Sequence, residues 1–148
     1  MNKHVTKQGR SEYLKTQVLT ASREQLLLML YDGAIRFSTQ AKEKMAERDC
    51  VGTHELLVRA QRVVVELMSA LNPDVDAVLC QRLSALYSFV YVRLVKANVE
   101  RSPKLVDEGL EVLTKLRDTW AEAVVKLKEE GEGASLPAPP QGRVSVRT

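Results

Sequence analysis

Apolar residues recur at helical spacing in four stretches of the chain, and a break follows each stretch. In every stretch they advance by three or four residues, which keeps them on one face of a helix. The spacing predicts helices over residues 22–47, 53–71, 74–100 and 102–130. The predicted core positions, helix by helix, are Leu26, Leu30, Ala34, Phe37, Ala41 and Met45; Leu56, Ala60, Val63, Val64, Leu67 and Leu71; Leu79, Leu83, Leu86, Val90, Leu94 and Ala97; and Leu105, Val112, Leu113, Leu116, Trp120, Ala123 and Leu127.

Signals for starting and stopping a helix agree with these stretches. Ser22 followed by Gln25 has the pattern of a capping box, and the segment RDCVGT at 48–53 interrupts the apolar spacing. Asn72-Pro73 ends the second helix, and Asp74 or Asp76 can cap the third. Ser102 followed by proline predicts the start of the fourth.

Four amphipathic helices with short connections predict an all-α fold, an antiparallel four-helix bundle. The run YSFVYVRLV at 87–95 resembles a buried strand, but no partner strand exists elsewhere in the sequence. We expect residues 1–21 to form a flexible N-terminal arm, residues 22–130 the bundle, and the Gly-, Pro- and Ser-rich residues 131–148 a disordered tail. Gly33 and Gly109 fall on core stripes, where we expect two helix backbones to approach closely.

The composition indicates a cytoplasmic protein. The longest uncharged run, Leu83 to Val92, has ten residues, about half of the ~20 that a membrane span needs, so we expect no membrane insertion. No apolar run follows the basic N-terminus, which argues against a secretory signal. The two cysteines, Cys50 and Cys80, show no CxxC spacing and are expected to be reduced thiols.

Charge and motifs exclude most alternative functions. Residues 1–25 hold five basic and two acidic residues, which accounts for the whole net charge of +3 and leaves the body neutral, so nucleic-acid binding is not expected. Neither His4 nor His54 has the upstream glutamate of a di-iron motif, and we find no nucleophile beside a base. We therefore expect no metal, no cofactor and no enzyme activity. A phosphorelay domain that uses His54 stays an alternative, because such domains are also four-helix bundles.

The informative feature is apolar surface beyond one stripe per helix. Fully burying one such side chain is worth about 1.5–3 kcal/mol, so we expect something to cover the surplus. The fourth predicted helix lacks it. The extra apolar and small residues are Leu28, Tyr31 and Ile35 in the first helix, Val58, Val65 and Met68 in the second, and Ser84, Ala85, Ser88, Tyr91, Val92 and Val95 in the third.

Three explanations of this surplus remain open. It forms a groove for an amphipathic partner segment, it packs inside a lopsided monomer, or it is the seam of a homodimer or larger structural homo-oligomer. The apolar residues Tyr13, Leu14, Val18 and Leu19 of the arm are candidates to fold over the groove when no partner is bound.

Five ordered segments resemble the flagellar secretion chaperone family, FliS. The first is Tyr13-x4-Val18-Leu19-Thr20-Ala21-Ser22-x-Glu24-Gln25-Leu26, which runs into LLLMLYDGAIRF. The others are HELLVRAQ at 54–61, Leu71-Asn72, LSALYSFVYVRLVKAN at 83–98 and LTKLRDTWAEA at 113–123. Together they cover about residues 13–123. Arg23 stands where the family commonly carries proline.

The resemblance implies a non-enzymatic helical chaperone that holds the C-terminal segment of flagellin, prevents premature polymerisation and delivers it for type III export. It also implies contact with a component of the flagellar export gate through the N-terminal tyrosine motif, which Tyr13 matches. The expected partner-binding residues are Tyr13 and Val18 by resemblance, and Val58, Val65, Met68, Ser88, Tyr91, Val92 and Val95 from the helical geometry. Trp120 belongs to a family motif but falls on a core stripe, so we expect it to pack.

Overall fold

The structure is a computed structural model that describes residues 10–12 and 22–134 of the chain. Beyond one helical turn at 10–12, these residues form four long helices: α2 (Arg23–Ala46), α3 (Cys50–Ser69), α4 (Ala77–Glu100) and α5 (Pro103–Ala134). The predicted all-α fold is confirmed. The predicted arm, apart from the turn at 10–12, and the predicted tail beyond residue 134 lie outside the described residues.

Short polar side chains cap the helices where the sequence places them. Ser22 accepts a hydrogen bond from the backbone N–H of Gln25, whose side chain accepts one from the backbone N–H of Ser22, so the predicted capping box is present. Asp76 caps α4 by accepting from the N–H of Leu79. Ser102 Oγ accepts from the N–H of Leu105, with proline at the first position of α5.

Several predicted boundaries differ from the structure: α3 ends at Ser69 rather than 71 and α4 begins at Ala77 rather than 74, and two further differences concern the start of α3 and the end of α5. α3 begins at Cys50, three residues before the predicted start, because the Asp49 side chain accepts from the N–H of Gly52 and caps the helix there. The break between α2 and α3 therefore spans only residues 47–49. α5 continues to Ala134, past the predicted end at 130.

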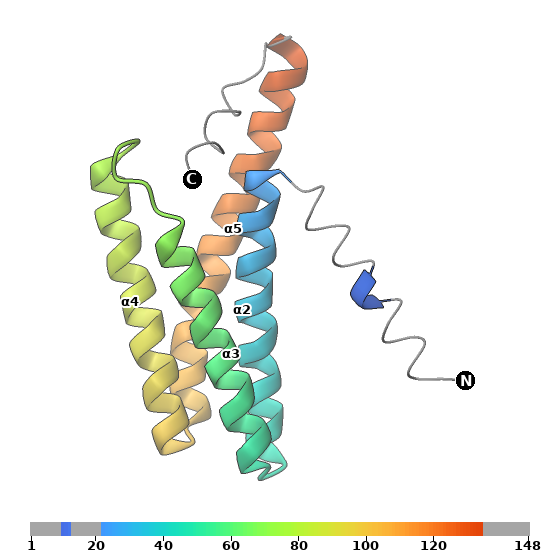
Figure 1. Cartoon of the computed structure of the whole chain (residues 1–148), viewed down its shortest axis with the longest axis vertical. Helices are drawn as coiled ribbons and strands as arrows, with labels where there is room; N and C mark the ends of the chain where they lie inside the picture. The colour runs from blue at the N-terminus through green and yellow to red at the C-terminus, as the bar shows by residue number, and fades with distance from the viewer. Residues whose placement is uncertain (1–9, 13–21, 135–148) are drawn as a thin grey trace.

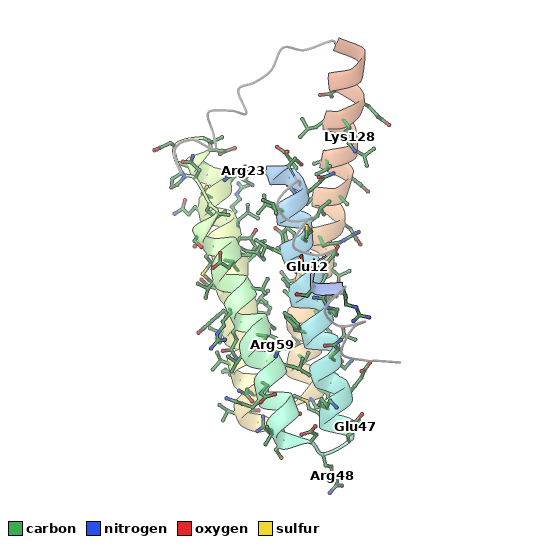
Figure 2. All side chains as sticks on the ribbon, turned by 45° about the vertical axis from the view of Figure 1, so that its right-hand side comes forward. Glu12, Arg23, Glu47, Arg48, Arg59 and Lys128 are labelled. Atoms are coloured by element: carbon green, nitrogen blue, oxygen red, sulfur yellow. The ribbon has the colours of Figure 1, made fainter. Side chains whose placement is uncertain are left out.

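Consecutive helices run antiparallel, and each packs on two neighbours: α2 on α3 and α5, and α4 on α3 and α5 (Figure 1). The starts of α2 and α4 and the ends of α3 and α5 therefore lie together, and we call this the open end of the bundle. Figure 1 shows α4 and α5 diverging toward it. Figure 2 labels Lys128 on the part of α5 that continues past Arg23 at the start of α2.

The fully buried core stops short of the open end, because it excludes the first turns of α2 and α4 and the part of α5 beyond Leu113. Its members are Tyr31, Ala34, Ser38, Ala41, Thr53, Leu57, Ala60, Val64, Leu67, Tyr87, Val90, Leu94, Ala97, Val106 and Leu113. No residue of 22–30, 68–86 or 114–131 is fully buried. Trp120 packs against the core as predicted, and its Nε1 donates to the backbone oxygen of Glu24 at 3.1 Å.

Several predicted core positions are wrong. Leu79 is 50% exposed and Leu86 is 38% exposed, because α4 leaves the bundle axis toward the open end. Leu127 is also more than half exposed, on the projecting part of α5. Conversely Tyr31, which we expected on the outside, is buried against Tyr87, and this corrects the predicted surplus on α2.

The two glycines on core stripes do not mark close backbone contacts. Gly33 is buried, yet no atom that a Cβ there would meet lies within 4 Å. At Gly109 a Cβ would stand 3.7 Å from side-chain atoms of Val90 and Leu94, which is ordinary van der Waals contact. The expected close approach of two backbones is therefore wrong at both positions.

Candidate docking surface

Helix α4 carries far more apolar surface than its neighbours cover. It is the one helix of the described residues long and apolar enough, by length and composition alone, to cross a membrane. One face of α4 is packed inside the bundle through the fully buried side chains of Tyr87, Val90, Leu94 and Ala97. Only 17% of its most apolar stretch is buried, so the opposite face remains open.

The open face of α4 presents a continuous row of apolar side chains. Its large exposed members are Val78, Phe89, Val92 and Val99, whereas the exposed Leu79 and Leu86 lie on the inner face, in line with Val90 and Ala97. Within this set Val78, Val92 and Val99, together with the exposed Ala85, are separated by multiples of seven residues and share one helical face. Isolated apolar residues are normal on a protein surface, whereas contiguous apolar rows are typical of interaction surfaces, so this row is a candidate for one.

Helix α3 contributes a matching row beside it. Val51, Val58 and Val65 follow one another at intervals of seven residues; Val51 and Val65 are exposed and Val58 is half-buried. The side of α3 that carries this row faces α4, because the neighbouring His54 places its Nδ1 2.9 Å from Asn98 Nδ2 on α4. The α3 row therefore borders a shallow groove between α3 and α4, to which α4 contributes Tyr91, and the exposed row of α4 lies on the outer side of that helix.

A hollow of about 450 Å³ lies in this groove. Its lining is mainly apolar and consists of Val58, Gln61, Arg62, Val63, Val65, Glu66 and Tyr91. Arg62 and Glu66 are exposed and supply opposite charges at the α3 edge. The mixture of apolar floor and polar rim suits a segment that buries one face and keeps the other in water.

The far edge of α4 is basic and braced against α5. Arg93 Nε lies 2.7 Å from Glu108 Oε1, and the Arg93 guanidinium stacks 4.4 Å from the centre of the Phe89 ring. The exposed Arg82 and Lys96 flank Phe89 at seven residues on either side and have no ion-pair partner among the described residues. No acidic residue occurs in α4 before Glu100.

The predicted binding residues are placed as follows. Val58, Val65 and Tyr91 line the hollow, whereas Met68, Ser88, Val92 and Val95 do not. Met68 and Tyr91 also pack partly against the core, so each contributes only part of its side chain to the surface. Val65 and Val92 are 47% and 45% exposed, Ser88 is exposed, and Val95 is half-buried. Tyr13 and Val18 lie outside the described residues.

Sequence reasoning missed other apolar members of this surface. Val51 was hidden in the segment treated as a break, although its spacing to Val58 and Val65 was available as a signal. Val78, Phe89 and Val99 belong to the exposed row of α4. They were overlooked because an almost wholly apolar helix does not show from sequence which face is outside.

The surface sits above a buried pair of tyrosines. The hydroxyls of Tyr31 on α2 and Tyr87 on α4 are 2.6 Å apart, and both rings are almost completely buried. Desolvation by burial raises the pKa of each phenol above its ordinary value, and for Tyr87 the hydrogen bond to Tyr31 raises it further. Tyr87 therefore holds α4 against the buried core. Between Tyr87 and the start of α4, the inner face of the helix is partly exposed.

The residues 10–12 and 22–134 contain no group of three His, Cys, Asp or Glu side chains arranged to hold a metal ion. His54, the candidate phosphorelay residue, is exposed near the start of α3. Its Nδ1 is hydrogen-bonded to the side-chain amide of Asn98.

Comparison with known proteins gives a consistent result. Residues 6–127 match the family model described as flagellar protein FliS. The chain is 30% identical over 122 residues to the flagellar secretion chaperone FliS of Bacillus subtilis, covering 82% of this chain and 90% of that protein. It is 28% identical to the Escherichia coli flagellar secretion chaperone FliS, covering 76% and 83%. A crystal structure described as a flagellar chaperone from bacteria has the same fold, with a TM-score of 0.66, 24% identity and coverage of 82% of this chain and 98% of that one.

Proposed function

Because this chain belongs to the FliS family of flagellar export chaperones, we propose that it binds the C-terminal segment of flagellin in the cytoplasm and holds it for type III export. The observation that carries this proposal is the uncovered apolar surface of α3 and α4. A segment destined for a filament core is apolar, and covering it on a preformed helical scaffold prevents it from polymerising early.

The scaffold suits this role because half of it is already packed. Docking on the α3–α4 groove leaves the core around Leu57, Val64 and Val90 unchanged, so little of the chaperone has to be ordered on binding. The groove itself offers apolar contacts with few fixed hydrogen-bonding groups, which favours retention of a segment that must later be released.

We further propose that the arm comprising residues 1–21 provides a second contact. By resemblance Tyr13 would engage a component of the flagellar export gate, and Val18 would take part in partner binding. The apolar arm residues are also suited to cover the groove before cargo arrives.

The binding surface is tested by charge substitution at its two exposed valines. We expect Val65→Glu and Val92→Glu each to weaken binding of a synthetic flagellin C-terminal peptide at least tenfold, because burying one valine contributes about 1.5–3 kcal/mol. Isothermal titration calorimetry measures the affinity, with an expected stoichiometry of one to one.

Val125→Glu is the matched control, since Val125 is 54% exposed on α5, away from the groove. Circular dichroism should show unchanged helical content in all three variants. Unchanged affinity in both groove variants, or equal loss in the control, would contradict the proposed surface. Failure of the peptide to bind the wild-type chain would contradict the proposed function itself.

A further inference from the structure

The outer side of α4 presents an apolar ridge rather than a hollow. The members of this ridge lie within about 80° of helical arc and extend over about 31 Å of the helix. They are Val78, Ala85, Phe89, Val92 and Val99, all exposed. None of them lines the hollow between α3 and α4, to which α4 contributes only Tyr91. A ridge offers contact to a flat surface, whereas the common modes of peptide recognition use a groove or a free sheet edge.

The two exposed cations of α4 lie along one edge of the ridge. Arg82 and Lys96 stand seven residues before and after Phe89, so the three side chains follow one line along the helix. Neither cation forms an ion pair with any residue that the structure describes. No acidic residue occurs in α4 before Glu100. An apolar helix face with basic residues beside it is typical of helices that lie in the interface of an anionic membrane.

The packing of α4 indicates a helix that lies on a membrane rather than across it. Its length and composition would suffice for a span, but its inner face is buried in the bundle, and Arg93 pairs with Glu108 on α5. A span would break these contacts and take basic side chains into hydrocarbon. With the ridge at the level of the headgroups, Arg82 and Lys96 can instead extend to lipid phosphates while the inner face stays packed.

Charge argues against a second copy of this chain on the ridge. Two ridges that paired in parallel would bring Arg82 beside Arg82, and two in antiparallel pairing would bring Arg82 beside Lys96. Like charges placed opposite one another are unfavourable in either arrangement. A surface of anionic lipid headgroups complements both cations at once and is also flat, as the ridge requires.

We propose that the outer ridge of α4 docks peripherally on a bilayer surface that carries anionic headgroups. The valines and Phe89 supply the apolar contact, and Arg82 and Lys96 supply the attraction to lipid phosphates. The inference is separate from the proposed function, because it concerns the outer side of α4 and not the segment held in the groove.

Vesicle flotation of the full-length chain tests the lipid preference. One set of vesicles is phosphatidylcholine alone, and the other is a one-to-two mixture of phosphatidylglycerol and phosphatidylcholine. We expect at least tenfold stronger partitioning onto the mixed vesicles in about 0.1 M NaCl, where charges attract over about 10 Å. The preference should shrink in 0.5 M NaCl because the two cations are exposed.

Variants locate the contact, since the basic residues of the arm also attract anionic vesicles. Arg82→Glu/Lys96→Glu should lower partitioning onto the mixed vesicles at least tenfold. Val78→Ser/Val99→Ser keeps the charge and removes apolar contact at two positions that are more than half exposed, and it should lower partitioning at least threefold.

The matched control is Lys126→Glu/Lys128→Glu, which changes the net charge equally at exposed positions on the projecting part of α5. It should stay within about twofold of wild type, since exposed charges more than a Debye length apart are largely screened. Circular dichroism should show the same helical content in all variants. Equal partitioning onto both vesicle types, no partitioning, wild-type behaviour of either α4 variant, or an equal loss in the control would overturn the inference.

Binding of the flagellin peptide separates this inference from the proposed function. If the wild-type chain binds the peptide and ignores both vesicle types, the membrane contact is wrong and the chaperone function stands. If Arg82→Glu/Lys96→Glu weakens peptide binding while vesicles are ignored, a protein segment occupies the ridge and the inference fails. A stable dimer that Val78→Ser/Val99→Ser dissociates would likewise overturn it, because the second copy would then cover the ridge.

Discussion

The paired hydroxyls of Tyr31 and Tyr87 are the polar centre of an otherwise apolar core. Among the described residues each hydroxyl bonds only to the other, across helices that are not neighbours in the ring of four. Burying a hydroxyl without a partner costs about 1–3 kcal/mol, so the pair favours the one arrangement of α2 against α4 in which both are satisfied.

We expect phenylalanine substitutions at the pair to be strongly non-additive. Tyr87→Phe leaves the Tyr31 hydroxyl buried without a partner and should lower the free energy of unfolding by about 1–2 kcal/mol. Tyr31→Phe/Tyr87→Phe removes both groups and should lie within about 0.5 kcal/mol of wild type. Urea unfolding followed by circular dichroism measures both values, and additive losses would show that the hydroxyl pair is not the cause.

The same pair should make stability fall at alkaline pH. The pKa of both buried phenols is raised, chiefly by desolvation, whereas in the unfolded chain tyrosine ionises near pH 10. The folded state therefore keeps its protons, and stability is unaffected below pH 10. Above it, the free energy of unfolding should fall by up to about 1.4 kcal/mol per pH unit for each tyrosine. Urea titrations between pH 8 and 11 test this, and an equal slope in the double phenylalanine variant would contradict it.

Helix α4 has two halves with different environments. Residues 87–97 contribute four fully buried side chains, whereas 77–86 contribute none. The first half is held at its end by the Asp76 cap and otherwise by partly buried contacts such as that of Leu83. Local stability follows buried contacts, so the two halves should open independently.

We expect amides of residues 77–86 to exchange with deuterium at least tenfold faster than those of residues 87–97. Native-state hydrogen exchange read by mass spectrometry measures the two segments separately when peptide fragments end near Tyr87, which lies at their junction. Both halves of α3 serve as an internal comparison. Equal protection across α4 would mean that the helix opens as one unit despite its uneven burial.

The sequence predicted those elements whose signals are local. The Ser22 capping box, the Asp76 cap and proline at 103 each set a helix boundary by contacts within one turn, and all are present. The face of α4 could not be predicted in the same way. Its residues are apolar nearly all round, so whether Leu86 or Tyr87 is buried depends on the angle at which α4 meets the other helices.

The candidate surface was predictable only where a helix has a clear core stripe. Val65 and Val92 were identified because they lie opposite clear core stripes, and both are exposed. Tyr31 was misplaced because its apolar ring alone suggested surplus, while its burial depends on a hydroxyl partner 56 positions away in sequence. Such a partner is set by the packing of the whole bundle.

At the scale of the molecule, ion pairs join α5 to its neighbours without supplying most of the stability. Lys42 pairs with Asp107, and Arg117 Nε lies 2.8 Å from Asp32 Oδ1, both between α2 and α5. These groups are partly exposed, and such pairs contribute about 0–1 kcal/mol each. The packed part of the bundle therefore depends on its apolar core.

Because the first half of α4 has no fully buried side chain, binding of a peptide should change both the free energy of unfolding and the local protection of this helix. Flagellin C-terminal peptide at one hundred times its dissociation constant should raise the free energy of unfolding by about 2.7 kcal/mol, because it binds only the folded chain. Hydrogen exchange should show the largest gain in protection at residues 77–86, which contain no fully buried side chain in the free protein. Val92→Glu should reduce both effects at the same peptide concentration. Because Val92 lies in residues 87–97, a gain in stability with no change in protection in either half of α4 would place the peptide elsewhere on the bundle.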